Sequence, residues 1–320
     1  MLVRVCLLLS TLAAVVLPGA VLAQPSGSST SAVRIIFVGD VMLDGGPGHL
    51  ITTGGDPFAD VAAVLKDADL TIANLECAVT TDGEVVRKSY TFKAPKSALP
   101  ILTRYFSAVS LANNHSADWG SRGLVNELTL LNEAKLPHFG GGVNLAQARE
   151  PLIMTRNGLR VAFLGYNGFH LSAYAAGRST PGVAPLDEAV MLADIKGART
   201  KNHADLVILV LHWGVELEAQ PTPEQQALAR RLIDAGADAI IGGHPHVTQT
   251  IEWHKGHPII YSLGNFVFDY FPTDPPVWLG WIARLTIGEP EGVKVETRDV
   301  EMDPEGVPHL QSKEWRDATR

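Results

Sequence analysis

Five apolar segments of this chain each end in a carboxylate, amide or imidazole side chain, and this repetition constrains the fold more than any other feature. The segments are 34–38, 70–73, 108–112, 206–211 and 237–241, and they are followed by Asp40, Asn74 and Glu76, Asn113 to His115, His212, and His244 and His246. Sites in open α/β sheets gather at the carboxyl ends of strands. The pattern therefore predicts one shared site built from several strand ends.

The segments between these strands predict helices and hairpins. Apolar residues recur at helical spacing in several intervening stretches; the predicted helices cover 58–68, 97–105, 122–134, 187–203 and 222–235. Asn157-Gly158 between apolar runs predicts a hairpin, and 278–287 with 293–302 predicts a second one. Hairpins beside crossovers indicate an α/β fold with mixed sheets, and two packed sheets flanked by helices fit better than one doubly wound sheet.

The clearest chemical motif is Gly242-Gly243-His244-Pro245-His246. Alternate residues of an extended segment point the same way, so both imidazoles can face one point. Glycine lets the backbone approach a ligand closely. Imidazole is a common metal ligand, and carboxylates with imidazoles suit Mn²⁺, Fe²⁺ or Zn²⁺ better than Ca²⁺. The sequence therefore predicts a divalent-metal site.

Composition limits the classes of partner. Hydrophobic residues make up 46% and charged residues 19% of the chain, which predicts a well-buried core. A formal net charge of -8 argues against nonspecific binding to nucleic acid or to an anionic membrane surface. A polyanionic substrate stays open, because bound metal reverses the local sign of the charge.

The first residues resemble an export signal. Arg4 precedes an apolar stretch, and small residues at Val21-Leu22-Ala23 predict cleavage, so 1–23 is a predicted signal peptide and 24–32 a linker. We expect a periplasmic or extracellular protein, with an uncleaved membrane anchor as the alternative. Cys77 is then the single cysteine after the signal, and a buried structural role is favoured over a ligand or nucleophile role.

The ordered motifs resemble the CapA family of poly-γ-glutamate capsule synthesis proteins, a divergent branch of the calcineurin-like metallophosphoesterases. The matching blocks are 39–42 (Gly-Asp-Val-Met), 74–76 (Asn-Leu-Glu), 112–115 (Ala-Asn-Asn-His) with Asp118 and Gly120, 212–216 (His-Trp-Gly-Val-Glu), 243–247 (Gly-His-Pro-His-Val) and 262–266 (Ser-Leu-Gly-Asn-Phe). The resemblance covers about 33–268 and implies a four-layer α/β/β/α sandwich and a centre for two divalent ions. We expect this domain to span 33–310, followed by a tail at 311–320.

The resemblance also assigns roles to residues. It implies metal ligation by Asp40, Glu76, Asn114, His212, His244 and His246, with Glu76 as the carboxylate that bridges the ions. His115 is the predicted catalytic residue, as a general acid or transition-state stabiliser. Asp118 either orients His115 or caps the following helix. Asn74, Glu216 and Asn265 are predicted to contact substrate or to support the ligands. Met42 stands where the superfamily carries a histidine ligand.

Three functions remain open at this level. The first is an exported metal-dependent hydrolase or transferase that acts on an anionic polymer or phosphoester in capsule synthesis, with a membrane complex as a further partner. The second is a non-catalytic accessory protein that binds a polyanion. The third is a secreted phosphatase or nucleotidase without a capsule role. Lys88 and Lys93 fall in a polar loop, for which a solvated position is favoured over anion binding.

Overall fold

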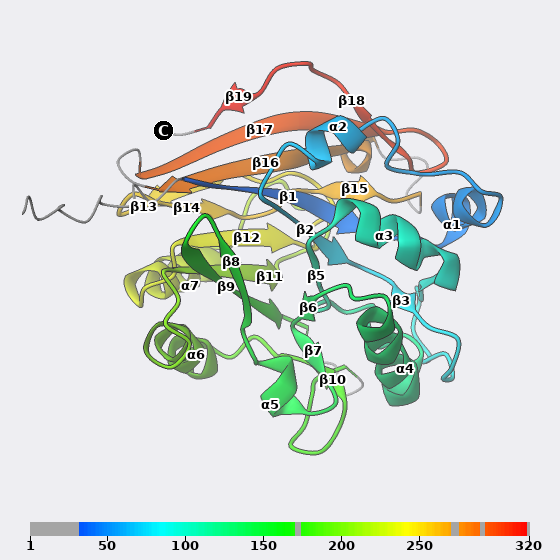
Figure 1. Cartoon of the computed structure of the whole chain (residues 1–320), viewed down its shortest axis with the longest axis horizontal. Coiled ribbons are helices and arrows are strands. Elements are labelled where there is room, and N and C mark those ends of the chain that lie inside the picture. Colours follow the sequence, from blue (N-terminus) through cyan, green and yellow to red (C-terminus); the bar gives the residue numbers. More distant parts are fainter. Residues whose placement is uncertain (1–31, 170–173, 270–274, 289–291, 319–320) are drawn as a thin grey trace, which may run out of the picture.

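Two β-sheets lie face to face, with helices on both outer sides (Figure 1). The computed structural model describes residues 32–169, 174–269, 275–288 and 292–318 of the 320-residue chain. The predicted export signal therefore lies outside the described residues. Among the described residues, no helix has the length and apolar character required to cross a bilayer.

The first sheet has nine strands and is mixed. Its strands β1, β2, β5 and β6 run parallel, whereas β1, β16, β17 and β18 pair in antiparallel fashion. Strand β15 adds to β1, and β19 adds to β17. The bounds are β1 (Val33–Val41), β2 (Leu70–Leu75), β5 (Ala108–Ser110), β6 (His138–Phe139), β15 (Asn265–Val267), β16 (Leu279–Gly288), β17 (Gly292–Met302), β18 (Pro308–Leu310) and β19 (Arg316–Asp317).

The second sheet has six strands in the order β13-β14-β12-β11-β9-β8. Its central strands are parallel, and both edges are antiparallel hairpins. The bounds are β8 (Leu152–Arg156), β9 (Leu159–Asn167), β11 (Leu206–His212), β12 (Ala239–Gly243), β13 (Ile251–His254) and β14 (His257–Ile260). The hairpins predicted at Asn157-Gly158 and at 278–302 are both present, with Asn157 in the left-handed region at φ 51°.

The helices form the two outer layers. The first sheet is covered by α1 (Gly45–Thr52), α2 (Ala62–Leu65), α3 (Leu99–Tyr105) and α4 (Gly120–Glu133), and the second by α6 (Glu188–Thr200) and α7 (Pro223–Asp234). The remaining elements are α5 (Leu145–Ala148), the pairs β3 (Ala78–Val79) with β4 (Lys93–Ala94) and β7 (Gly141–Gly142) with β10 (Gly182–Val183), and 3₁₀ turns η1 (Lys96–Ala98) and η2 (Pro275–Trp278).

Three apolar clusters separate these layers. One lies between the first sheet and α1 to α4, one between the second sheet and α6 with α7, and one between the two sheets. Phe37 and Phe163 meet in the cluster between the sheets, with ring centroids 6.3 Å apart. The predicted four-layer α/β/β/α sandwich with mixed sheets is therefore confirmed.

One helix prediction differs from the structure, and one helix was missed. The segment predicted as a helix over 58–68 is α-helical only at Ala62–Leu65 and otherwise forms turns. Helix α1 was not predicted, because its sequence begins Gly-Gly-Pro-Gly, which has low helix propensity. Asp44 caps it by accepting from the Gly45 N–H, and Asp269 accepts from the Gly46 N–H at 2.5 Å.

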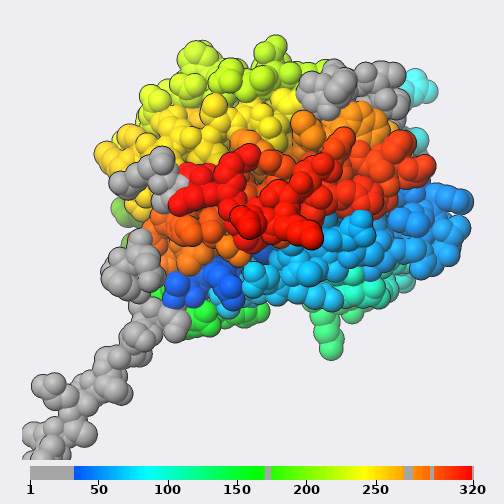
Figure 2. Space-filling view, turned by 90° about the horizontal axis from the view of Figure 1, so that it is seen from above, coloured from blue at the N-terminus to red at the C-terminus, as the bar shows by residue number. Residues whose placement is uncertain are grey.

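The segment predicted as a tail lies against the domain. Figure 2 shows the C-terminal residues, in red, running across the face seen from above. Strand β19 pairs with β17, and the Trp315 ring lies 4.1 Å from the Arg284 guanidinium. The indole N–H of Trp253 donates to the Ala318 carbonyl at 3.1 Å.

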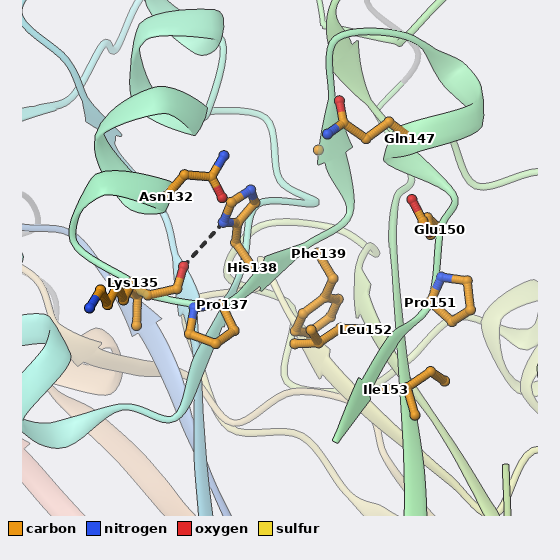
Figure 3. A pocket seen from close by; sticks show the side chains of 12 residues that line it. Asn132, Lys135, Pro137, His138, Phe139, Gln147, Glu150, Pro151, Leu152 and Ile153 are labelled. Carbon is orange, nitrogen blue, oxygen red and sulfur yellow. Dashed lines mark hydrogen bonds between the residues drawn. The ribbon is translucent and has the colours of Figure 1, made fainter. Parts of the chain in front are cut away.

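A cavity of about 410 Å³ opens between edge strands β6 and β8, beside α5 and the end of α4 (Figure 3). His138 lines it, and its Nδ1 lies 3.2 Å from the Leu136 carbonyl. The cavity contains none of the residues predicted for the metal site. The two sheet edges that form it are separate from the strand ends that carry the polar motifs.

Candidate metal centre

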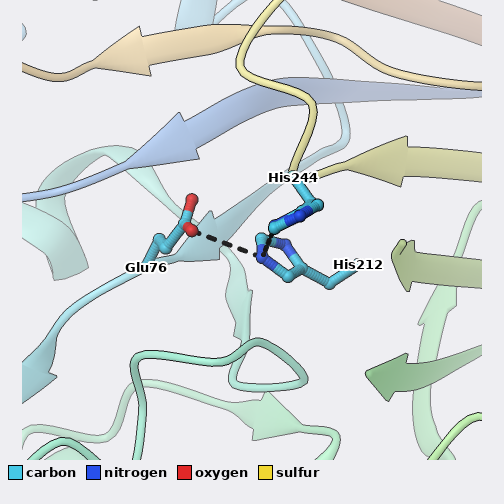
Figure 4. Close-up of side chains that lie close together, drawn as sticks. All are labelled: Glu76, His212 and His244. Carbon is cyan, nitrogen blue, oxygen red and sulfur yellow. Dashed lines mark hydrogen bonds and ion pairs between the residues drawn. The ribbon is translucent and has the colours of Figure 1, made fainter. Parts of the chain in front are cut away.

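The predicted ligands meet where the carboxyl ends of strands from both sheets face each other. In the first sheet Asp40 pairs in register with Asn74 across β1 and β2, and in the second sheet His212 pairs with Gly243 across β11 and β12. Glu76 directly follows β2, and its side chain points toward His212 and His244 (Figure 4). The structure thus brings together side chains that the sequence separates widely.

One set of ligand atoms surrounds the His212 ring. The His212 Nε2 atom lies 2.8 Å from Asn114 Oδ1, 3.2 Å from His244 Nδ1 and 3.3 Å from Glu76 Oε1. Two ligand atoms that each lie about 2.1 Å from a tetrahedral ion are about 3.4 Å apart. The three distances from His212 Nε2 are therefore close to those between ligands of one ion.

A second set consists of Asp40, Glu76 and His246, whose ligand atoms lie within 4.8 Å of one another. Asp40 is held in place from two sides: Oδ1 accepts from Asn74 Nδ2 at 2.8 Å, and Oδ2 accepts from the His244 N–H at 3.1 Å. His246 Nδ1 lies 3.6 Å from Asp40 Oδ2. Glu76 belongs to both sets, which is the position that the family resemblance predicts for a bridging carboxylate.

Glu76 is fully buried, and neither of its carboxylate oxygens has a hydrogen-bond partner among the described residues. Burial, reinforced by the negative charge of Asp40, raises the pKa of Glu76 well above its usual value. A buried carboxylate without a partner is costly, and a coordinated cation would offset that cost. The residues present therefore fit a divalent ion.

Burial keeps three imidazoles of the centre neutral. Desolvation lowers the pKa of His115 and of His212 to about 4, and it lowers the pKa of His244 well below the usual value. Metal ligation requires the neutral imidazole, so these rings need lose no proton to bind an ion.

Three phenylalanine rings that the sequence did not identify as part of the site produce much of this burial. Phe92 packs on His115 with ring centroids 4.3 Å apart, Phe169 on His244 at 3.8 Å, and Phe268 on His246 at 4.9 Å. Phe169 and Phe268 each closely follow a strand, β9 and β15 respectively. Their position beside strand ends could have indicated a place in the site, but an apolar residue at such a position usually belongs to the hydrophobic core.

Asn113 is a structural member of the site to which the sequence assigned no role. Its side-chain nitrogen donates to Asn74 Oδ1 at 3.0 Å, and its Oδ1 accepts from the backbone N–H groups of His115 and Ser116. Asn74 in turn donates to Asp40 and lies 3.2 Å from His212 Nδ1. Asn113 therefore shapes the turn that presents Asn114 and His115 and also orients Asn74.

His115 and Asp118 are in contact. The Nδ1 atom of His115 lies 2.8 Å from Asp118 Oδ2, and its Nε2 lies 4.0 Å from Glu76 Oε1. Asp118 makes no helix cap: α4 begins after Trp119, whose side chain makes no capping hydrogen bond. Of the two roles predicted for Asp118, the geometry matches the one in which it orients His115.

Lys88 lies inside the site, although the sequence favoured a solvated loop. Its side chain is only 16% exposed and forms an ion pair with Asp118. The ammonium also donates to the Asn114 carbonyl at 2.7 Å and lies 4.9 Å from the Tyr174 ring centroid. These contacts attach the 80–92 loop to the turn that carries Asn114 and His115.

Asn265 and Glu216 lie at the rim of the second set. Asn265 Oδ1 lies 2.8 Å from His246 Nδ1, while its Nδ2 donates to the Val277 carbonyl at 3.2 Å. This arrangement makes the His246 Nδ1–H the donor and leaves its Nε2 lone pair for ligation. Glu216 is exposed, and its carboxylate lies within 4.8 Å of ligand atoms of His244 and His246.

The backbone of the histidine motif differs from the predicted extended segment. β12 ends at Gly243, and the next turns place His244 at φ 95° and His246 at φ 59°. Positive φ is strained for residues with a Cβ and is found mostly at functional sites. Both rings still reach the centre, but through left-handed turns rather than strand alternation.

Three residues near the motifs face apolar cores. Met42 is buried in the cluster beneath α1 to α4, so it supplies no imidazole-like ligand from the β1 block. Trp213 packs in the cluster beneath α6 and α7 and donates to the Tyr261 carbonyl at 3.1 Å. Cys77 is fully buried, and its Sγ accepts from the Leu43 N–H at 3.4 Å.

Known proteins are similar to this chain in sequence or in fold. The capsule biosynthesis protein CapA of Bacillus anthracis is 34% identical over 252 residues, which cover 74% of this chain and 60% of that protein. The PGA biosynthesis protein CapA of Bacillus subtilis (strain 168) is 36% identical over 248 residues, covering 75% of this chain and 64% of that protein. The chain thus spans about three-fifths of the length of these relatives.

A solved structure of a hypothetical protein from Thermus thermophilus matches with a TM-score of 0.50 and 16% identity, over 87% of this chain and 98% of that one. This likeness concerns the fold alone. The family model described as bacterial capsule synthesis protein PGA_cap matches residues 34–270, which include every predicted site residue. By these matches, the chain belongs to the PGA_cap family of bacterial capsule synthesis proteins.

Proposed function

We propose that this protein is an exported, metal-dependent hydrolase or transferase that acts on an anionic polymer in poly-γ-glutamate capsule synthesis. The observation that carries the proposal is Glu76, a fully buried carboxylate without a hydrogen-bond partner among the described residues, which is shared by two sets of metal-ligating side chains. The family supports the capsule context, and the centre supports the chemistry.

Two divalent ions would supply Lewis-acid contacts to an anionic group and an activated water molecule. His115 would contribute proton transfer. Because Asp118 accepts the Nδ1 proton of His115, the Nε2 lone pair faces the centre and can receive a proton. As a general acid, the role predicted from the sequence, His115 would first have to take up that proton. Lys88 holds the charge of Asp118 and thereby keeps the ring oriented.

A cavity that contains two lysines supports an anionic substrate. It has a volume of about 420 Å³ and lies between α1 and the β3–β4 pair. Lys93 and Lys96 line it together with Asp44, and neither lysine forms an ion pair with a residue that the structure describes. The residue before Lys93 is Phe92, whose ring packs on His115. Successive carboxylates of a polymer could pair with these lysines in a protein of net charge -8.

Metal content and turnover test the proposal together. Purified protein loaded with Mn²⁺ is expected to hold two ions per chain and to cleave or transfer poly-γ-glutamate. His246→Ala should lose metal, whereas His115→Ala should keep the metal and lose roughly 10²–10⁴-fold in rate. His254→Ala, which changes an imidazole on β13 that pairs with Asp234, is the control. A wild-type protein without stoichiometric transition metal would contradict the proposal.

The second candidate is a non-catalytic accessory protein that uses its ions to bind a polyanion. The observation favouring it is the second ligand set, which has three members because Met42 lies in the core. Binding of metal and polymer without turnover would select it. Hydrolysis of a generic phosphodiester, with poly-γ-glutamate left intact, would instead select the third function, a secreted phosphatase or nucleotidase.

A further inference from the structure

The two ligand sets of the proposed centre are unequal. Glu76, Asn114, His212 and His244 supply four protein ligands to one ion, whereas Asp40, Glu76 and His246 supply three to the other. Position 42 adds none, because Met42 packs in the apolar cluster beneath α1 to α4. A side chain on the open side of the second set is therefore the one to look for.

Glu216 lies beside one histidine of each set. It is on the loop after β11, and its carboxylate forms a third group with His244 and His246, with ligand atoms within 4.8 Å of one another. Two ligand atoms on opposite sides of an ion are about 4.3 Å apart at ordinary bond lengths. The Glu216 carboxylate is therefore close enough to these imidazoles to bind an ion together with them.

The loop that carries Glu216 is attached to the histidine turn on both sides of the motif. The Leu217 N–H donates to the Pro245 carbonyl at 2.9 Å, and Gln249 Nε2 donates to the Glu218 carbonyl at 2.7 Å. Gly214 at φ 97° and Leu217 at φ 63° bend the loop back toward the centre. The position of Glu216 over the two imidazoles is therefore set by the fold.

The charge of Glu216 also calls for a cation. The carboxylate forms no ion pair or hydrogen bond with a residue that the structure describes, yet it borders a centre proposed to bind anions. An unneutralised carboxylate there would repel such a substrate. With Asp40 and Glu76 it brings three negative charges to two divalent ions, which leaves the centre positive.

We propose that Glu216 is a direct metal ligand of the centre, supplied from the β11–α7 loop beside His244 and His246. This inference rests on the proposed two-ion centre. It goes beyond the sequence-based expectation of a contact with substrate, and it makes Glu216 a requirement for the full affinity of one of the two ions.

Mn²⁺ binding to the full chain tests the inference. Calorimetric titration in chelator-buffered Mn²⁺ should resolve two ions for the wild type. Glu216→Ala and Glu216→Gln should weaken one of them at least tenfold and leave the other unchanged. The electron paramagnetic resonance spectrum should change from that of a coupled Mn²⁺ pair to that of an isolated ion. Glu218→Ala, an exposed carboxylate two residues away on the same loop, should bind as the wild type does.

The outcomes separate this inference from the proposed function. If the wild type binds two ions and both Glu216 variants do so with unchanged affinity, the inference is overturned while the two-ion centre stands. Loss of polymer affinity in those variants, with both ions retained, would assign Glu216 to the substrate instead and also overturn it. If the wild type binds no ion, the proposed function itself fails. Because the Glu216 side chain is exposed, both variants are expected to fold. Circular dichroism checks this.

Discussion

Two fully buried glutamates have different surroundings: one lies among possible metal ligands and the other does not. Glu76 shares its two ligand groups with His212, His244, Asp40 and His246, and a bound cation would offset its lack of hydrogen-bond partners. Glu127 on α4 lies in no ligand group found among the described residues; its Oε1 accepts from the Val79 N–H at 2.9 Å, and its Oε2 has no partner there. Burial raises the pKa of Glu127 to about 8, so it is protonated at neutral pH.

Glu127→Gln should therefore change the pH dependence of stability. In the wild type, the contribution of Glu127 to the free energy of unfolding is fully present below about pH 4.5, where the carboxyl is protonated in the unfolded chain as well. Between about pH 4.5 and 8 only the unfolded chain ionises at this residue, so the free energy of unfolding falls by up to about 1.4 kcal/mol per pH unit. Glutamine should remove this slope, which urea unfolding at pH 5, 6.5 and 8 measures. Glu133→Gln, exposed on the same helix, should leave it; equal slopes in Glu127→Gln and wild type would refute the assignment.

At the scale of elements, the centre depends on strands that approach without side chains between them. A Cβ added at Gly243, the last residue of β12, would lie 2.6 Å from Asp40 Oδ1 at the end of β1. Asp40 also takes the His244 N–H as a donor, so β12 and β1 meet through this carboxylate. Glycine at this position is required by the close approach of two strands from different sheets.

Gly243→Ala should displace the Asp40 carboxylate and lower Mn²⁺ affinity at least tenfold, with the fold retained. The matched control is Gly197→Ala on α6, where an added Cβ meets nothing within 4 Å. It should keep full metal affinity and gain about 0.5–1 kcal/mol in stability from helix propensity. Calorimetry and thermal unfolding measure the two effects; unchanged affinity in Gly243→Ala would contradict the role of this contact.

Strand β4 and the η1 turn carry the second element-scale prediction. The double substitution Lys93→Ala with Lys96→Ala removes two cations from the 420 Å³ cavity and should weaken poly-γ-glutamate binding several-fold. The loss should be larger at low salt, where screening is weaker. Metal content should stay unchanged. Lys196→Ala with Lys201→Ala, two exposed lysines on α6 and at its end, is the charge-matched control. Equal loss of affinity in the control would show that only net charge matters.

At the scale of the molecule, the centre joins the two sheets. Asp40, Glu76 and Asn114 come from strand ends of the nine-stranded sheet, and His212, His244 and His246 from those of the six-stranded sheet. Ions bound there would cross-link the layers on both sides of the central cluster. Metal binding should therefore stabilise the whole domain against unfolding.

Thermal unfolding with and without Mn²⁺ tests this coupling. At a free Mn²⁺ concentration 100 times Kd, the gain in unfolding free energy should be about 2.7 kcal/mol per ion, because the ion binds the folded state alone. His246→Ala should reduce the gain, and chelator should abolish it in the wild type. A midpoint that does not respond to Mn²⁺ would show that the two sheets are not linked through the ions.

Features that depend on neighbouring residues were predictable from the sequence. Helix α7 has the Thr222 and Gln225 capping box that its sequence indicates, and the Asn157-Gly158 turn joins β8 to β9. Apolar runs that end in polar residues identified the strands and placed their chemistry at one edge, because parallel strands point their carboxyl ends the same way. These outcomes follow from backbone hydrogen bonds and burial patterns within short stretches.

Other features depend on contacts between distant segments, and only the tertiary structure decided them. Helix α1 forms despite its glycines because Asp269, far along the chain, accepts from the Gly46 N–H. Lys88 is buried because Asp118 and the Asn114 carbonyl surround its ammonium. That Glu76 serves both ligand sets follows from two sheets packing face to face. Local sequence lists the ligating side chains, whereas their distances to one another arise only from how the layers pack.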